Sequence, residues 1–263
     1  MLSPRTACLP ADLERDGFVV VEDALEGAAL RRVCAAVDRV FRSESSNGDA
    51  LHLLGFVGRD PSFVELVDHP AVLPFVAAVL GWNIYVYHCH LDVHPPEGDP
   101  EPRWRWHQDG GRQNVELPSP RPRLSLKVAY FLTDVPTGAH GAMRVVPGSH
   151  RRDRLSRARE PVGAVPLLVR AGTAVVFDRR LWHARGDNRS NATRRALFYG
   201  YTHRWIRPRD ELALDPGLVA GLSPLRRQLL GVGCSTIGYW IPEDEDVPLR
   251  ELASAWAAGD APA

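Results

Sequence analysis

Residues 84–93 read Ile84-Tyr85-Val86-Tyr87-His88-Cys89-His90-Leu91-Asp92-Val93, and this stretch decides the fold. It is rich in aromatic and β-branched residues and alternates with a period of two, which is typical of a β-strand. Many short strands separated by glycine and proline turns favour a barrel or a sandwich. Such further strand candidates follow at 123–133, 142–146, 165–170, 173–178 and 195–205.

The segments before this region have a helical period instead. Residues 10–23 predict a short helix, a stop at Gly17 and then a strand. Another helix is expected near 61–80, with an interruption around His69-Pro70, because the residue before proline disfavours helix. Residues 26–43 place six apolar side chains on one helical face, namely Leu30, Val33, Ala36, Val37, Val40 and Phe41.

The C-terminal part, residues 207–263, predicts helices and loops, with one helix starting near Pro224. Helices first and many short strands afterwards predict an α+β protein. We expect a single domain over residues 1–263. It would have a helical part over about 1–80, a β-barrel core over about 84–205, and C-terminal helices and loops over about 206–263.

The composition is that of a soluble globular protein. Hydrophobic residues make up 44% of the 263 residues and charged residues 24%. The 32 basic residues balance the 32 acidic ones, which argues against nucleic acid or an anionic membrane as the main partner. There is no signal-peptide pattern, and no apolar stretch approaches the roughly 20 residues of a membrane span. The four scattered cysteines are typical of free thiols, so we expect a cytoplasmic protein.

Three residues predict a metal site. His107 and Asp109 lie two positions apart, so on a strand both side chains would point to one face. His183 lies far along the chain and can join them only if the sheet folds back on itself. Two imidazoles and one carboxylate can bind one face of a non-haem Fe(II) and leave the other face open for a cosubstrate and oxygen. His-x-Asp alone is common in surface turns, and the segment around His183 is what makes a metal site the favoured interpretation.

A fourth residue would hold the cosubstrate. 2-Oxoglutarate chelates iron through its 1-carboxylate and keto oxygen, and its far carboxylate needs a buried cation. Arginine offers a bidentate fork for such a group. Arg194 and Arg195 are both candidates, and strand alternation would point them to opposite faces, one as the anchor and the other as a surface or structural residue.

These residues resemble the motifs of the phytanoyl-CoA dioxygenase-like (PhyH) family of Fe(II)/2-oxoglutarate oxygenases. The resemblance covers nearly the whole chain, and the family's arginine lies eleven positions past the distal histidine, which selects Arg194. It implies a double-stranded β-helix, a jelly-roll or cupin-like barrel, with flanking N-terminal and C-terminal helices. The similar segments are residues 14–21, His107-Gln108-Asp109, residues 138–150 ending in Pro147-Gly148-Ser149-His150, and residues 177–188.

The resemblance also implies an activity. The cofactors would be Fe(II), 2-oxoglutarate and O2, and the enzyme would hydroxylate an unactivated C–H bond of a small molecule with release of succinate and CO2. Lys127 is the single lysine among 32 basic residues, which suggests a GC-rich bacterial genome and favours secondary metabolism. Three alternatives stay open: an acyl-CoA substrate, cyclisation, epimerisation or desaturation as the outcome, and a non-catalytic barrel that senses iron or 2-oxoglutarate. The sequence does not decide the oligomeric state.

Further residues are expected around this site. Tyr130, where relatives place an aromatic residue, and His90, on an inward strand position, would contact 2-oxoglutarate, with ordinary barrel packing as the alternative. Lys127 would lie on the face opposite Tyr130, in a structural ion pair. The substrate would border Gly111, Arg112, Gln113 and Trp205, for which an exposed turn or core packing is the alternative.

A rival metal site is also present in the sequence. His88-Cys89-His90 with His94 and Glu97 is similar to the His-x-His opening of a cupin. Its spacing fits poorly, and it leaves His107, Asp109, His183 and Arg194 without a role.

Overall fold

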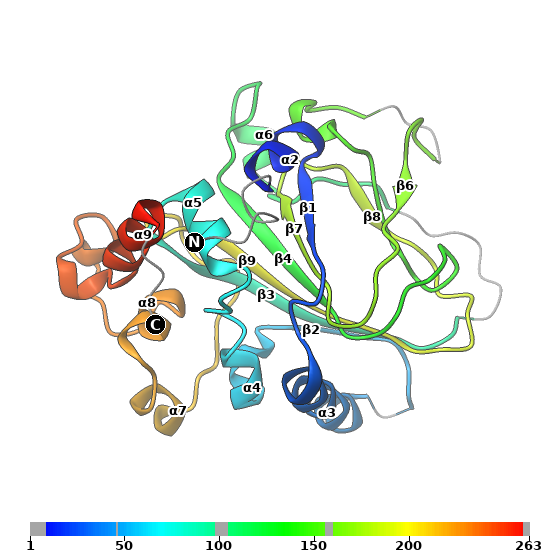
Figure 1. Cartoon of the computed structure of the whole chain (residues 1–263), viewed down its shortest axis with the longest axis horizontal. Coiled ribbons are helices and arrows are strands. Elements are labelled where there is room, and N and C mark those ends of the chain that lie inside the picture. The colour runs from blue at the N-terminus through cyan, green and yellow to red at the C-terminus, as the bar shows by residue number, and fades with distance from the viewer. Residues whose placement is uncertain (1–8, 46, 98–104, 156–159, 260–263) are drawn as a thin grey trace.

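The computed structural model describes residues 9–45, 47–97, 105–155 and 160–259 (Figure 1). Two antiparallel sheets form the core of the structure. The larger sheet has the order β1 (Phe18–Val21), β7 (Ala174–Asp178), β4 (Ser125–Phe131), β9 (Arg194–His203), β3 (Ile84–His94) and β2 (Leu51–Leu54). The smaller sheet has the order β6 (Val165–Pro166), β5 (Met143–Val145) and β8 (His183–Arg185).

Helices cover the outer face of the larger sheet. They are α2 (Leu9–Asp16), α3 (Gly27–Glu44), α4 (Pro61–Val64) and α5 (Leu73–Leu80). In Figure 1, α3 and α4 lie on one side of β3 and β9, and the strands β6 and β8 of the smaller sheet lie on the other side. The C-terminal helices are α7 (Pro216–Ala220), α8 (Pro224–Leu229) and α9 (Leu249–Ala258), of which α8 packs against β3 and α9 against α5. No helix of the described part is long and apolar enough to cross a bilayer.

The alternation of β3 separates two environments. Val86, Cys89 and Leu91 belong to the apolar core under the helices, whereas His88 and His90 point into a cavity between the sheets. The register against β9 shifts between Val86 and His88, so the alternation changes phase there. All eleven residues of β3 are buried, because one face of the strand meets the helices and the other meets the second sheet.

Three tyrosines fasten the larger sheet to its helical cover. The hydroxyls of Tyr130, Tyr199 and Tyr201 donate to backbone carbonyls of the segment that joins α4 to α5 and of α4 itself. Their acceptors are Leu66 at 3.2 Å, Phe63 at 2.8 Å and Val67 at 2.9 Å. A buried tyrosine hydroxyl needs such a partner, so these bonds satisfy the three side chains.

The α+β class and the order of elements expected from the sequence are confirmed. The first helix and strand, the long helix over 27–44 and the break around His69-Pro70 are all present. The sheets resemble a jelly roll, but the described strands do not close into one continuous hydrogen-bonded barrel. The sequence did not predict β2, β8 or the short helix α6 (Gln113–Glu116), because segments of three or four residues are too short to show a period.

A turn glycine before β7 gives a stability prediction. Gly172 has φ +92°, and a Cβ there would lie 2.1 Å from the Leu25 carbonyl oxygen, a backbone atom that cannot move aside because the Leu25 N–H donates to the Gly172 carbonyl at 2.9 Å. We expect Gly172→Ala to lower the free energy of unfolding by more than about 2 kcal/mol in a urea titration. Gly163→Ala is the matched control, because Gly163 has φ +81° and nothing within 4 Å. Equal losses in both variants would show that backbone strain alone decides the cost.

Candidate functional site

His107 and His183 are joined by their backbones. The two residues form an isolated antiparallel bridge, in which each N–H donates to the other's carbonyl at 3.0 Å. Their rings lie side by side, with centroids 4.2 Å apart and planes 51° apart. His183 belongs to β8, and His107 pairs with it through this bridge. The backbone pairing therefore brings the two histidines together.

Asp109 is held differently from what the sequence predicts. The expected strand through His107 and Asp109 is wrong: beyond the bridge residue the chain bends, and Gly110 and Gly111 have φ of 121° and 49°. The Asp109 N–H donates to the Arg179 carbonyl at 2.8 Å, which fixes the bend. The carboxylate still reaches the histidines, so the shared face comes from a turn rather than from strand alternation.

The three side chains form a group that could hold a metal ion. His107 Nε2 lies 3.8 Å from Asp109 Oδ1, and His183 Nε2 lies 3.9 Å from Asp109 Oδ2. All three ligand atoms lie within 4.8 Å of one another, so one ion with bonds of about 2 Å can reach them after small movements. His183 and Asp109 are buried while His107 is half exposed, which leaves one side of the group open.

Both imidazoles are oriented for a metal. His107 Nδ1 lies 2.9 Å from the Arg105 carbonyl oxygen, and His183 Nδ1 lies 2.9 Å from the Leu181 carbonyl oxygen. A carbonyl only accepts, so each Nδ1 carries the proton and each Nε2 keeps its lone pair. Such a backbone partner is the common support of a metal-binding histidine. The donor set therefore fits a divalent ion.

Lys127 compensates the charge of Asp109. Its Nζ lies 3.2 Å from Asp109 Oδ2, and both side chains are buried. Burial opposes ionisation of Asp109, but Lys127 and the two histidines outweigh it and lower the pKa of the carboxyl. Burial and the neighbouring His107 lower the pKa of His183 to about 4. The group thus presents a carboxylate and a neutral imidazole at neutral pH, as a cation requires.

Removing this lysine should destabilise the metal-free protein. In Lys127→Met the buried carboxylate loses its counter-charge, and breaking a buried ion pair from one side costs about 3 kcal/mol or more. We expect a urea titration to show that loss, and a saturating divalent ion to restore most of it. Arg195→Met, which breaks a half-buried pair with Asp38 (3.0 Å), should cost less than about 1 kcal/mol. Unchanged stability of the metal-free Lys127→Met protein would contradict this account.

Arg194 lines the same cavity as His107, Asp109 and His183. The cavity has a volume of about 740 Å³. Arg194 is 3% exposed, and its Nε and Nη1 have no hydrogen-bond partner. Burial lowers its pKa to about 10, although the nearby Asp92 acts in the opposite direction, so the guanidinium remains charged. Arg195 points to the other face, where its Nε donates to Asp38 on α3 at 3.0 Å.

The inward face of β3 forms a row of hydrogen-bonded polar residues. His88 Nδ1 lies 2.5 Å from Asp210 Oδ2, His90 Nδ1 lies 3.0 Å from His88 Nε2, and His52 Nδ1 lies 2.6 Å from Asp92 Oδ1. The ligand atoms of His52, His90 and Asp92 also lie within 4.8 Å of one another. There, however, His52 and Asp92 already satisfy each other at hydrogen-bond distance, so the group centred on Asp109 fits an ion better.

The cupin-like alternative fails because its residues are engaged separately. His88 and His90 share the inward face of β3, but His88 Nδ1 is already paired with Asp210 at 2.5 Å. Glu97 instead forms an ion pair with Arg185, with Arg185 Nη2 3.4 Å from its Oε1. The residues of that motif therefore do not converge on one point.

Some of the other predicted residues reach this region and some do not. His90 lines the cavity and stacks on Phe198, with ring centroids 4.3 Å apart. Gly111, Arg112 and Gln113 line a second pocket of about 530 Å³, which also contains His107 and Asp109. Tyr130 is not brought to the cavity, because it lies three residues from Lys127 on the outward face of β4. Trp205 lines a different pocket and stacks on His203.

Sequence reasoning missed several residues of the cavity. Lys127 was expected in an ion pair, but its partner Asp109 was not predicted. Alternation along β4 was the sequence feature that could have placed Lys127 on the face of the site. Arg185 lies two positions after His183, which on β8 places both on one face. Arg209 carries no sequence signal, because it reaches the cavity from an irregular segment after β9, where it donates to His88.

Comparisons with known proteins identify the family of this chain. The model of the phytanoyl-CoA dioxygenase (PhyH) family matches residues 13–196. The dioxygenase andF of Emericella variicolor is 31% identical over 237 residues, which are 83% of this chain and 82% of that protein.

Two solved structures share the fold. HygX from Streptomyces hygroscopicus, crystallised with nickel and 2-oxoglutarate, has a TM-score of 0.66 at 15% identity, covering 83% of this chain and 94% of that one. The non-heme alpha ketoglutarate dependent carbocyclase SnoK from nogalamycin biosynthesis has a TM-score of 0.61 at 24% identity, covering 84% and 91%.

Proposed function

This chain belongs to the phytanoyl-CoA dioxygenase family, and from that premise we propose that His107, Asp109 and His183 hold its iron and that Arg194 binds its 2-oxoglutarate. The family, the enzyme class and the cofactors expected from the sequence are confirmed: the protein is an Fe(II)- and 2-oxoglutarate-dependent dioxygenase. The assignment of individual residues is our proposal.

One observation carries the assignment. A single cavity is lined both by the three ligand side chains and by a buried arginine with two unpaired nitrogens. An unpaired buried guanidinium is costly unless an anion joins it, and a dicarboxylate that chelates a metal with one end presents its other carboxylate for such a partner. Arg185 and Arg209 line the cavity too, but His94 and Glu97 engage the first, and His88 engages the second.

The residues around the site set up the reaction. Iron with 2-oxoglutarate and O2 supplies an oxidant able to break an unactivated C–H bond, with release of succinate and CO2. The two histidines keep their Nε2 atoms free because backbone carbonyls hold Nδ1. Lys127 keeps Asp109 ionised. The apolar contacts between the sheets, including Phe177 and Phe198, limit water on the closed side.

The substrate would bind on the open side of His107. The adjoining pocket presents Gly111, Arg112 and Gln113 together with Tyr87 and Arg209, a polar lining suited to a small oxygenated molecule. We propose hydroxylation of a small molecule in bacterial secondary metabolism. The naming of SnoK as a carbocyclase from nogalamycin biosynthesis supports that metabolic setting and makes cyclisation a second outcome of the same C–H chemistry.

An anaerobic titration tests the cofactor assignment. Fe(II) and then 2-oxoglutarate are added to the metal-free protein while the visible spectrum is recorded. We expect a weak charge-transfer band that saturates at one equivalent of each, followed by succinate formation when air is admitted. Succinate added in place of 2-oxoglutarate is the control, because it lacks the keto oxygen of the chelate and should give no band. Iron binding without a band would favour a non-catalytic metal-binding barrel.

A further inference from the structure

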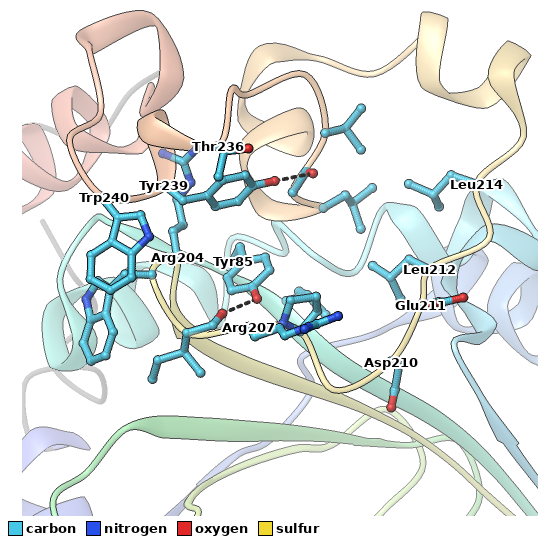
Figure 2. A pocket seen from close by; sticks show the side chains of 17 residues that line it. Tyr85, Arg204, Arg207, Asp210, Glu211, Leu212, Leu214, Thr236, Tyr239 and Trp240 are labelled. Atoms are coloured by element: carbon cyan, nitrogen blue, oxygen red, sulfur yellow. Dashed lines mark hydrogen bonds between the residues drawn. The ribbon is translucent and has the colours of Figure 1, made fainter.

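A third pocket, of about 640 Å³, lies beside the C-terminal end of β9 (Figure 2). It shares no lining residue with the cavity of the three metal ligands, and it shares Arg207 with the pocket proposed for the substrate. Its walls come from β3 through Tyr85, from the segment after β9, residues 204–214, and from the C-terminal segment over residues 230–240. The proposed function leaves this pocket without a role.

The pocket is lined mainly by apolar and aromatic groups. The Tyr85 hydroxyl donates to the Ile206 carbonyl at 2.5 Å, and the Tyr239 hydroxyl donates to the Gly231 carbonyl at 2.7 Å. Both side chains therefore present ring surfaces to the pocket. Trp205 and Trp240 lie at the rim with ring centroids 6.4 Å apart, and they are 43% and 66% exposed. Exposed tryptophans beside a hollow are typical of a binding site for a flat apolar group.

Arg204 is a buried cation without a counter-charge in this pocket. It is 2% exposed, and its Nε and Nη1 have no hydrogen-bond partner. The guanidinium lies over the ring of Tyr239, 5.0 Å from the centroid, and Figure 2 shows the two side chains on the same side of the hollow. A cation–π contact offsets only part of the loss of hydration, so the site favours an anion.

The acidic groups of the region are Asp210, Glu211 and Asp246. Asp210 is bonded to His88, and Figure 2 shows Asp210 and Glu211 on the side of the pocket opposite Arg204. Asp246 accepts the backbone N–H of Glu243 at 3.3 Å and also lies beside Cys234, where it raises the pKa of the thiol. Within the described part of the chain, no ion pair is found between Arg204 and any of these acids.

The neighbouring thiol does not neutralise Arg204 either. Burial raises the pKa of Cys234, and the opposing effect of Arg204 is smaller, so the thiol stays protonated at neutral pH. The positive charge of Arg204 is therefore left for a ligand.

We infer that this pocket binds an amphipathic organic anion, whose carboxylate, sulfonate or phosphate pairs with Arg204 and whose flat apolar body packs against Tyr85, Tyr239 and Trp240. A buried guanidinium whose Nε and Nη1 are unpaired can donate charge-assisted hydrogen bonds to such an anion. A mainly apolar hollow with a few fixed polar groups is the usual form of a small-molecule site, and Arg207 adds a second cation to this lining. The inference does not depend on the iron site.

Two fluorescent probes of matching shape test it. 8-Anilinonaphthalene-1-sulfonate carries an anionic group, and N-phenyl-1-naphthylamine is nearly the same molecule without it. We expect the full-length protein to bind the sulfonate at one site with at least tenfold higher affinity than the neutral probe. Arg204→Met should remove that preference, whereas Arg204→Lys should keep part of it. Trp240→Ala should weaken both probes, because it removes a wall and no charge.

Arg194→Met is the matched control, since it makes the same change at the other buried arginine with unpaired nitrogens. It should leave the preference for the sulfonate intact. If Arg194→Met removes that preference and Arg204→Met does not, the anion binds in the other cavity and the inference is overturned. The melting temperature of Arg204→Met should equal or exceed that of the parent protein, because an uncompensated buried charge is removed. A clearly lower melting temperature would show that Arg204 is a structural residue and would also overturn it.

Discussion

Replacing Asp109 by alanine should abolish succinate formation and lower the affinity for Fe(II) by at least about 100-fold. Asp109 is the only carboxylate of the three-residue group, and it lies within 4 Å of the Nε2 atoms of both histidines. Loss of an outer-shell partner already costs a metal site about 10- to 100-fold, and loss of a direct ligand costs more. Calorimetry with Fe(II) under argon and a succinate assay measure the two effects.

Asp92→Asn is the matched control, because Asp92 is the carboxylate of the other group that could hold a metal, with His52 and His90. It should still bind one equivalent of Fe(II). Asp109→Asn accompanies the alanine variant, since it preserves the size of the side chain beside Lys127 and so separates loss of a ligand from loss of packing. Iron bound by the Asp109 variants and lost in Asp92→Asn would move the metal to the row of residues on β3.

Replacing Arg194 by methionine should raise the dissociation constant of 2-oxoglutarate by about 30-fold or more while Fe(II) binds as before. A buried charge pair that loses one partner costs about 2–5 kcal/mol, which corresponds to that range of affinity. The visible band should be absent at 2-oxoglutarate concentrations that saturate the parent protein. The metal-free variant should be no less stable, because Arg194 has two unpaired buried nitrogens before the cosubstrate binds.

Arg195→Met serves as the neighbouring control, since Arg195 pairs with Asp38 on the helical face, and it should change the affinity by less than about twofold. A second comparison uses 2-oxohexanoate, a 2-oxo acid without the distal carboxylate. Arg194→Met should lose most of the discrimination between this acid and 2-oxoglutarate. If Arg194→Met binds 2-oxoglutarate normally and Arg185→Met does not, the anchor is Arg185 on β8.

Local patterns were sufficient for much of this result. The alternation over residues 84–94 separates apolar from polar side chains on β3, and the same rule distinguishes Arg194 from Arg195 on β9. His107, Asp109 and His183 could be proposed because two histidines and a carboxylate are a recognisable ligand set. Tyr130 shows the limit of this rule: alternation places it opposite Lys127, but it does not tell which of the two faces of β4 meets the site.

Contacts between distant segments could not be predicted in this way. The bridge between His107 and His183 joins residues 76 positions apart, and the ion pair of Lys127 with Asp109 depends on how a turn approaches β4. The pocket of Arg204 is closed by a C-terminal segment that has no strong period.

By itself, the sequence determined the family, the strand and helix periods, and the residue types of the proposed metal site. Only the tertiary structure decided that Asp109 reaches the histidines from a bend, that Lys127 is its counter-charge, and that Arg204 is left buried and unpaired. The physical reason is that periodicity reports the backbone conformation of neighbouring residues. The register between sheets, and the charges that this register brings together, depend on packing between segments far apart in the chain.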